Sequence, residues 1–404
     1  MSALIKFRAE RPVRKVLLYS HDTYGLGHIR RNLAIAEHLL ARNPSLQIVL
    51  VSGSVVGHRF ELPRGLSLVN LPPVVKAGPE SYRPLDPRLS LGLVRRARTA
   101  VIADVTRRLK PDLLLVDHAP AGMGGELLKV FEMLSRERAR TRIVLGLRDV
   151  LDEPEAVVDT WSRQGIYKLL DEVYDEIYVY GQRDMFDVGS AYGMPPSVSR
   201  RLQYTGYLDR SRSAPSDLTR IDRPFLLATA GGGGDGAEVL SAALEAGGRL
   251  GLGTLVVTGP LIDAPQRAAL DARAASTPRA RVVTFDPALG SLMRAASVVV
   301  TMGGYNSMCE AVAAGTPTIV VPRTWPRREQ LVRAELFAER GLVDVVAQGP
   351  GLAERLAPVI RDRLRDPLRR HAGIDLDGLD RLTTGLLRHD PVSDMVAVRE
   401  ELAA

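Results

Sequence analysis

The segment from Thr301 to Pro322, TMGGYNSMCEAVAAGTPTIVVP, constrains the fold more than any other part of the chain. An apolar run over 296–300 predicts a buried strand, two glycines follow it, and a helical pattern begins near Asn306. Glycine lets a backbone approach a ligand closely, and the first N–H groups of a helix lack partners within it. Glu310 lies about one turn further along the same helix face. The unit can therefore hold a phosphate on helix N–H groups and ribose hydroxyls on a carboxylate; a plain βα turn with a solvated Glu310 is the alternative for this segment alone.

Bulk properties narrow the class of protein. A length of 404 residues exceeds one compact core and predicts two domains. The single cysteine, Cys309, excludes an intrachain disulfide and a cysteine-cluster metal site, which fits a reducing cytoplasm. The net charge of +7 favours anionic partners, but no nucleic-acid motif occurs, so phosphorylated small substrates explain it better than nucleic acid. We expect no signal peptide and no membrane span, because no long apolar run occurs.

Apolar runs typical of buried strands alternate with helical patterns along most of the chain, which predicts parallel sheets of βαβ units. The clearest are KVLLYS, LQIVLVS, DLLLVD, RIVLGL and EIYVYG, then PFLLATA, GTLVVTG, RVVTF, SVVVTM and PTIVVP. A polar stretch from Arg210 to Pro224 separates the two series and has the composition of a linker. We expect one Rossmann-like domain over 1–212 and another over 213–390, with 391–404 forming a helix that can pack back on the first.

Both halves repeat one pattern, a buried strand followed by a glycine-rich turn and a helix. The first copy is VLLYSHDTYGLGHIRRNLAIAEHLL and the second is FLLATAGGGGDGAEVLSAALEAG. Ligands bind at the carboxyl ends of parallel strands, so two such domains facing each other would bring both turns into one cleft. We expect the active site in that cleft.

These motifs resemble those of GT-B glycosyltransferases, and most of all the MurG-like group around the lipid II UDP-N-acetylglucosamine transferase. The resemblance is specific at YGLGH (24–28), GGGGDGA (231–237), GGYNSMCEAVAAGTP (303–317) and RREQLVRA (327–334). It implies an α/β GT-B fold, two Rossmann-like domains with parallel sheets facing across a cleft, and a nucleotide-sugar donor in the second domain.

The resemblance also implies site residues. Glu310 falls on the carboxylate that the family uses for ribose, and Phe285 with Asp286 falls where the backbone reads the uracil edge. The expected donor residues are Gly233, Gly234, Asp235, Gly236, Phe285, Asp286, Gly303, Gly304, Tyr305, Asn306, Glu310, Glu329 and Gln330. The expected acceptor residues are Asp22, Tyr24, Gly25, Gly27, Arg148 and Asp149, although the last two equally fit an ion pair at a sheet edge. Gly234, Asp235 and Glu329 depart from the family's residues, so the sugar can differ while the mode of nucleotide binding holds.

Glycosyl transfer needs a base that takes a proton from the acceptor. His28 ends a glycine-rich turn at a helix start, and its unperturbed pKa near 6.5 suits this role, although it equally fits a histidine that packs the helix start. Asp117 ends the strand DLLLVD, where plant-type GT-B enzymes place the aspartate of a His–Asp dyad. His118 or Asp22 are alternative cleft residues, and Asp117 can instead cap the next helix.

The sequence thus predicts a metal-independent, inverting hexosyltransferase that moves a sugar from a UDP-sugar, with UDP-N-acetylglucosamine as one candidate, to a small or lipid-linked acceptor. We expect no cofactor, and we expect the lone Asp-x-Asp at 375–377 to be surface rather than a metal site. The alternatives are a UDP-sugar 2-epimerase or hydrolase on the same scaffold, or a non-catalytic nucleotide-sugar-binding protein. A basic amphipathic pattern over 89–110 is typical of a domain face, and it also suits a cytoplasmic protein that rests on an anionic membrane.

Overall fold

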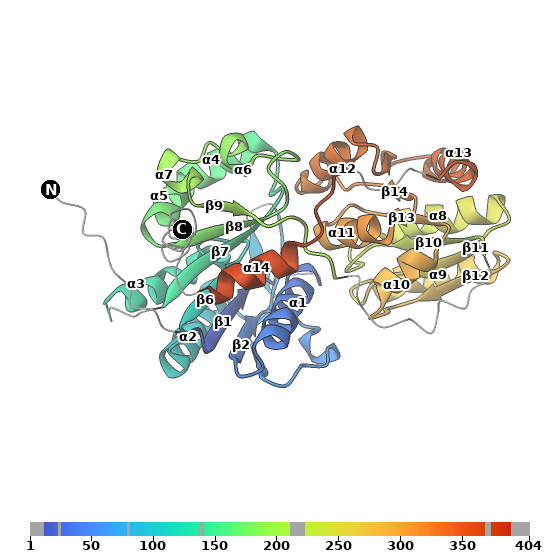
Figure 1. Ribbon diagram of the computed structural model, residues 1–404. Coiled ribbons are helices and arrows are strands. Elements are labelled where there is room, and N and C mark those ends of the chain that lie inside the picture. Colours follow the sequence, from blue (N-terminus) through green and yellow to red (C-terminus); the bar gives the residue numbers. More distant parts are fainter. Residues whose placement is uncertain are drawn as a thin grey trace, which may run out of the picture.

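The computed structural model describes residues 12–22, 26–78, 81–136, 141–210, 223–367 and 373–388. Two α/β domains lie side by side, each with helices on both faces of a parallel sheet (Figure 1). The expected linker falls mostly in 211–222, outside the described residues, as do Tyr24, Gly25 and the whole of 391–404.

The first domain contains a seven-stranded parallel sheet in the order β3-β2-β1-β6-β7-β8-β9. Its strands are β1 (Lys15–Ser20), β2 (Gln47–Ser52), β3 (Leu66–Asn70), β6 (Leu113–Asp117), β7 (Arg142–Arg148), β8 (Glu176–Tyr180) and β9 (Leu202–Tyr204). The strand order reverses beside β1, which pairs with β2 on one side and β6 on the other. A crevice at the carboxyl ends of β1 and β6 is therefore the expected ligand site of this domain.

Helices and a short hairpin cover this sheet. They are α1 (Gly27–Arg42), η1 (Gly57–Arg59), α2 (Leu91–Leu109), η2 (Met123–Gly125), α3 (Leu128–Arg136), α4 (Pro154–Gln164), α5 (Ile166–Glu172), α6 (Val188–Ala191) and α7 (Pro196–Ser199), with the hairpin β4 (Val74–Lys76) and β5 (Tyr82–Pro84). The predicted basic helix is α2; Ser90 caps it by accepting from the Leu93 N–H, and its apolar stripe, which includes Val94 and Ile102, is buried.

The second domain contains a six-stranded parallel sheet in the order β12-β11-β10-β13-β14-β15. Its strands are β10 (Phe225–Thr229), β11 (Gly253–Val257), β12 (Ala280–Val283), β13 (Val298–Thr301), β14 (Thr318–Val320) and β15 (Asp344–Val345). Its helices are α8 (Ala237–Arg249), α9 (Ala264–Ala275), α10 (Leu289–Ala295), α11 (Tyr305–Ala314), α12 (Glu329–Glu339) and α13 (Leu352–Arg365). The strand order reverses here between β10 and β13, so both predicted glycine turns of this domain leave the sheet at one crevice.

The last described helix, α14 (Gly378–Leu387), returns to the first domain (Figure 1). Its Leu379, Leu382 and Leu386 join a core cluster that also holds residues of α1 and β1. Asp380 accepts a hydrogen bond from Arg42 at 3.1 Å. This helix, which lies within the stretch 213–390 expected for the second domain, therefore packs against α1 of the first.

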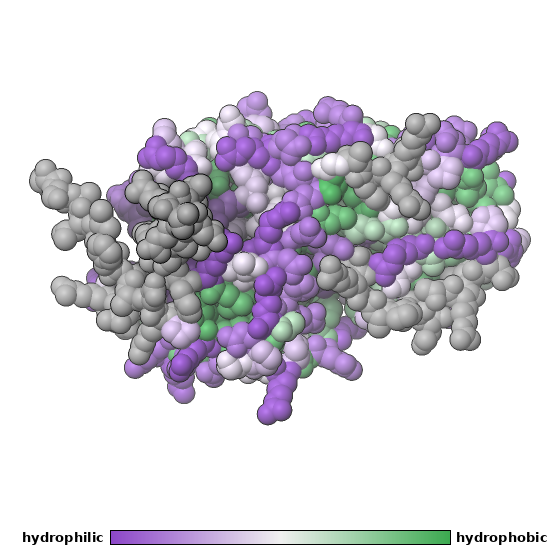
Figure 2. Space-filling view, in the orientation of Figure 1, coloured by the Kyte–Doolittle hydropathy of each residue, from purple (hydrophilic) through white to green (hydrophobic). Residues whose placement is uncertain are grey.

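The apolar runs form the core as predicted: every residue of β6, β10 and β11 is buried. The surface seen in Figure 2 is largely hydrophilic, with apolar residues in small separate areas. The exposed large apolar side chains are Val55, Leu62, Leu85, Leu89, Leu91, Leu93, Leu128 and Trp325. Among the described helices, none combines the length and apolarity needed to cross a membrane.

Candidate active site

The helix that follows β1 and the helix that follows β13 begin opposite each other, one from each domain. The Asn306 side chain at the start of α11 donates to the Gly27 carbonyl at the start of α1 over 2.8 Å. Neither helix start has a hydrogen bond from the side chain of its N-cap residue. The two crevices thus meet in one cleft, as the repeated strand–turn–helix pattern predicts.

His28 lies on the first turn of α1, and Asp117 lies at the carboxyl end of β6. Their atoms Nδ1 and Oδ2 are 2.6 Å apart, and the His28 side chain is 21% exposed whereas that of Asp117 is fully buried. Arg31, one turn after His28, donates to both oxygens of Asp117 at 2.7–2.9 Å. The structure therefore brings the two predicted catalytic residues together and adds a buried arginine.

Burial favours a neutral imidazole at His28, and the neighbouring cation favours an ionised carboxylate at Asp117. Burial lowers the pKa of His28, and the negative charge of Asp117 opposes this only in part. Burial would raise the pKa of Asp117, but Arg31 and His28 outweigh it and lower that pKa to about 2. Nδ1 of His28 lies 2.6 Å from Asp117 Oδ2 and 2.8 Å from Arg31 Nη2. Because Arg31 Nη2 already donates to Asp117 at 2.7 Å and an ionised Asp117 only accepts, we assign the Nδ1 proton to the contact with Asp117, which leaves Nε2 to accept a proton.

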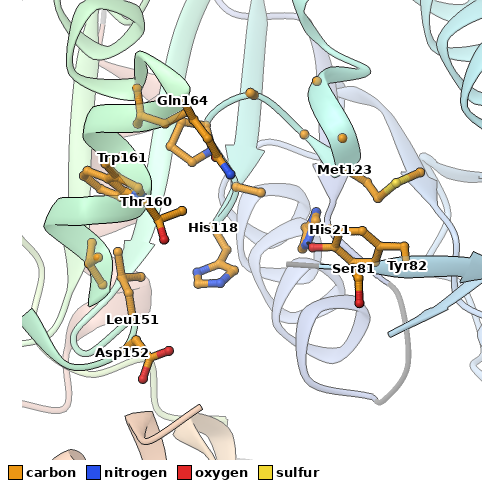
Figure 3. A pocket seen from close by; sticks show the side chains of 18 of the residues that line it. His21, Ser81, Tyr82, His118, Met123, Leu151, Asp152, Thr160, Trp161 and Gln164 are labelled. Atoms are coloured by element: carbon orange, nitrogen blue, oxygen red, sulfur yellow. Dashed lines mark hydrogen bonds between the residues drawn. The ribbon is translucent and has the colours of Figure 1, made fainter. Parts of the chain in front are cut away.

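A pocket of about 700 Å³ lies next to these residues and is lined almost entirely by the first domain (Figure 3). Its walls include Met123, Leu151 and Trp161, and two imidazoles, His21 and His118, point into it. The His118 ring centroid lies 5.2 Å from that of His28. Such a volume fits a small organic molecule or the end of a larger one.

Arg148 and Asp149, both predicted on the acceptor side, have different surroundings. Asp149 is 2% exposed and accepts from the Nε and Nη2 atoms of Arg333 at 2.8–3.0 Å. Arg333 belongs to α12, so this buried ion pair joins the two domains, and Asp149 is engaged away from the pocket. Arg148 contacts His118, with 3.2 Å between Nη2 and Nε2.

Asp22 also faces inward. Its Oδ1 accepts from the Ile29 N–H at 3.0 Å and its Oδ2 from the Ser52 hydroxyl at 2.6 Å. This aspartate satisfies the first turn of α1 and ties the ends of β1 and β2 together, so both carboxylate oxygens are already used.

Glu310 lies on α11 below the helix start and is 2% exposed. Its Oε1 accepts from Arg30 at 3.2 Å and from Arg210, whereas Oε2 has no hydrogen-bond partner among the described residues. Burial raises the pKa of Glu310, but the charges of Arg30 and Arg210 outweigh this effect. The net pKa lies below its usual value, so the carboxylate stays ionised. One oxygen thus remains to accept from a hydroxyl.

Two positions in the glycine-rich turn after β10 have no room for a larger residue. Gly233 has φ +94, and a Cβ there would lie 2.2 Å from the Thr258 carbonyl oxygen. A Cβ on Gly236 would lie 2.0 Å from the Cβ of Ala230. Next to Gly304 there is open space for at least 4 Å, at the side of the α11 start. Backbone N–H groups in such turns and at the helix start can bind an anion.

Arg323 connects three of the predicted donor residues. It donates to Asp235 at 2.9 Å and to Glu329 at 2.6 Å, and its backbone N–H donates to Gln330 at 3.1 Å. Gly234 lies in the same turn as Asp235. The sequence reasoning missed Arg323, although its place directly after β14, at the same sheet edge, was a usable signal.

The remaining predicted donor residues differ in their orientation. Tyr305 is 3% exposed, and its hydroxyl accepts from the Leu208 N–H at 3.1 Å, so this side chain packs at the domain interface. Asp286 accepts from the Ala288 N–H at 2.7 Å, and the ring of Phe285 lies 6.1 Å from that of Phe60 in the first domain. Gly303, with φ +81, forms the turn before α11. No cluster of three or more His, Cys, Asp or Glu able to hold a metal occurs in the described parts of the chain.

Residues 231–374 match the family model described as the glycosyltransferase family 28 C-terminal domain. No curated protein sequence matches the chain.

Solved structures match over nearly the whole length. UGT89C1 of Arabidopsis thaliana, complexed with UDP, is 15% identical, with 94% of this chain and all of that one covered and a TM-score of 0.60. CalG4, the calicheamicin glycosyltransferase, is 19% identical over 96% and 98%, with a TM-score of 0.54. MurG of Acinetobacter baumannii is 14% identical over 97% and 100%, with a TM-score of 0.53. The expected two-domain glycosyltransferase fold is confirmed.

Proposed function

From the premise that the chain is a glycosyltransferase with the GT-B fold and a family 28 C-terminal domain, we propose that it transfers a sugar from a UDP-sugar to an acceptor hydroxyl with inversion, and that His28 is the general base. The observation that carries this proposal is the His28–Asp117 contact of 2.6 Å beside a pocket, opposite the glycine turns of the second domain.

The reaction follows from this arrangement. The acceptor oxygen attacks the anomeric carbon while its proton passes to Nε2 of His28. The bond from that carbon to the diphosphate oxygen breaks on the opposite face, which inverts the configuration. Asp117 fixes the tautomer of the imidazole and stabilises the cation that forms. General-base catalysis by a group such as His28 typically contributes about 10²–10⁴-fold in rate.

The diphosphate that leaves carries negative charge toward the second domain. The first N–H groups of α11 and the turn at 231–236 are the groups placed to bind it, and Oε2 of Glu310 can accept from a ribose hydroxyl. The UDP bound in the Arabidopsis neighbour supports a uridine nucleotide, and UDP-N-acetylglucosamine is the first donor to test because the sequence resembles its lipid II transferase. We propose that these groups act without a metal ion.

The epimerase alternative needs extra acidic residues at the sugar, and Asp235 and Glu329 alone are not enough for it. Both carboxylates contact Arg323, each through one oxygen. A hydrolase or a non-catalytic protein is separated from a transferase by the experiment below.

A peripheral membrane contact belongs to the same proposal. Leu85, Leu89 and Leu93 are 41–47% exposed just before and at the start of α2, whose Arg95 lines the pocket. Apolar side chains flanked by arginine suit an anionic lipid surface, which would bring a lipid-linked acceptor to the pocket. Sedimentation with anionic vesicles checks this: wild type should bind, and Leu89→Ser/Leu93→Ser should bind more weakly.

The experiment is a panel of nucleotide sugars in the presence of EDTA, read by thermal shift and by release of UDP with and without a panel of hydroxyl acceptors. We expect one UDP-sugar to raise the melting temperature and UDP release to depend on an acceptor. Release that does not need an acceptor would indicate a hydrolase. A protein that no nucleotide sugar stabilises would refute the proposal.

A further inference from the structure

Arg148 differs from the other buried or half-buried arginines of the cleft in having no carboxylate partner within ion-pair distance in the described part of the chain. Arg31 is paired with Asp117, Arg333 with Asp149, Arg323 with Asp235 and Glu329, Arg30 and Arg210 with Glu310, and Arg327 with Asp152. The only hydrogen bond that Arg148 makes there is to His118, and its Nε is buried without a partner.

The surroundings of Arg148 disfavour its positive charge. Burial lowers the pKa of Arg148 to about 10, and the nearby charge of Arg333 acts in the same direction, opposed in part by Glu329. The guanidinium is still charged at neutral pH. A buried charge that no carboxylate contacts destabilises the folded state, and a ligand that supplies this contact explains its presence.

His118 lines the pocket and contacts Arg148. Burial lowers the pKa of its imidazole well below the usual value, so the ring is neutral, and Nε2 accepts from Arg148. The proton then resides on Nδ1, which is buried without a partner. The backbone of His118 has φ +70, a conformation that costs energy in a residue other than glycine and holds this ring in the pocket beside His28.

We propose that Arg148 and His118 form a subsite for an anionic oxygen, of a phosphate or a carboxylate group, next to the His28 base. The contacts of Arg148 and His118 support the subsite by themselves, whereas the identity of its ligand rests on the proposed function. Two sources supply the same chemistry: the diphosphate of the donor, or an acidic group on the acceptor.

The test is isothermal titration of full-length wild type, Arg148→Met and Arg148→Lys, with Arg108→Met as the control at an exposed arginine on α2 (80% exposed). UDP and uridine are titrated into the free protein. Inorganic phosphate is titrated into both the free and the UDP-saturated protein. A loss of at least tenfold for UDP with uridine unchanged assigns the donor diphosphate. A loss only for phosphate on the UDP-saturated protein assigns an acidic acceptor group. Arg148→Lys should retain part of the affinity in either case.

Melting temperature separates a ligand role from a structural one. Removing an unpaired cation near Arg333 should leave the melting temperature of Arg148→Met unchanged or raise it. If that variant failed to fold, His118→Asn, which keeps a residue tolerant of positive φ, would be titrated instead. Unchanged affinity for UDP and for phosphate, or a fall in melting temperature without any loss of affinity, would overturn the subsite. None of these readings depends on turnover, so failure of the proposed function would be seen separately.

Discussion

The carboxyl end of the first sheet presents ionisable side chains, whereas that of the second presents mainly glycine backbone. His28, Asp117 and Arg31 are held by hydrogen bonds of 2.6–2.9 Å in a largely buried group. The turns at 231–236 and 303–304 are rich in glycine, and a Cβ at Gly233 or Gly236 would clash with neighbouring atoms. A group that moves a proton has to be held and have its pKa set by neighbours, whereas an anion is bound well by backbone alone. Substitutions in the His28, Asp117 and Arg31 group should therefore lower kcat, and those in the glycine turns of the second domain should weaken donor binding.

The largest effect is expected from Asp117→Asn. It leaves one acceptor oxygen where His28 and Arg31 now share two, so the amide NH2 faces one of them, and it leaves Arg31 buried without a counter-ion. We expect kcat to fall by about 100-fold or more and the free energy of unfolding to fall by about 3–5 kcal/mol. Steady-state kinetics and chemical denaturation measure the two. A variant that kept both wild-type values would show that Asp117 has no part in the site.

Gly233→Ala tests the glycine-rich turn at 231–236 in the second domain. Its Cβ would lie 2.2 Å from a carbonyl oxygen at φ +94, so the turn has to shift. We expect UDP to bind at least tenfold more weakly, measured by titration, while kcat at saturating donor changes little. Gly92→Ala, on the surface helix α2 with its nearest neighbour atom 3.9 Å away, is the control and should bind UDP as wild type does. Equal affinities in the two variants would remove the turn from the donor site.

Glu310→Gln should have a smaller effect on the same property. Hydrogen bonds to charged groups contribute about 1.5–3 kcal/mol, and glutamine keeps part of this, so we expect about a tenfold rise in the dissociation constant for UDP. The melting temperature should also fall, because Arg30 and Arg210 lose their carboxylate. Glu354→Gln, at an exposed pair with Arg249, is the matched control and should change neither quantity. Tighter UDP binding in Glu310→Gln would mean that the two arginines, rather than ribose, are its partners.

The pH dependence of kcat should show the smallest change. The pKa of His28 is lowered, so the neutral base is present at pH 7, and kcat should fall as pH decreases through a value below 6.5. Because Asp117 raises the pKa of His28 against the effect of burial, the acidic limb of Asp117→Asn should move to lower pH. A limb above pH 7 in wild type would contradict a buried neutral base.

Much of this arrangement was predictable from the sequence. Long apolar runs are typical of buried parallel strands, so the major strands were found, and strand ends place His28 and Asp117 in one crevice although 89 positions separate them. The short strands β3, β9 and β15 were missed, since their half-exposed residues lack a continuous apolar pattern.

Side-chain partners were not predictable in the same way. Arg333 and Asp149 are 184 positions apart and lie in different domains, so only the domain packing pairs them. The same holds for Arg30 with Glu310, and for the side chain of Tyr305, which contacts Leu208 at the domain interface. A local pattern fixes where the backbone turns, but the direction of a long side chain is decided by whatever lies across the interface.

The most direct test is the pair of values kcat and the UDP dissociation constant in His28→Ala. We predict a fall in kcat of at least 100-fold with an unchanged dissociation constant, because the base lies on the first domain and the nucleotide on the second. A His28→Ala variant with wild-type kcat, or one that lost UDP binding and kcat in parallel, would contradict this division of the cleft.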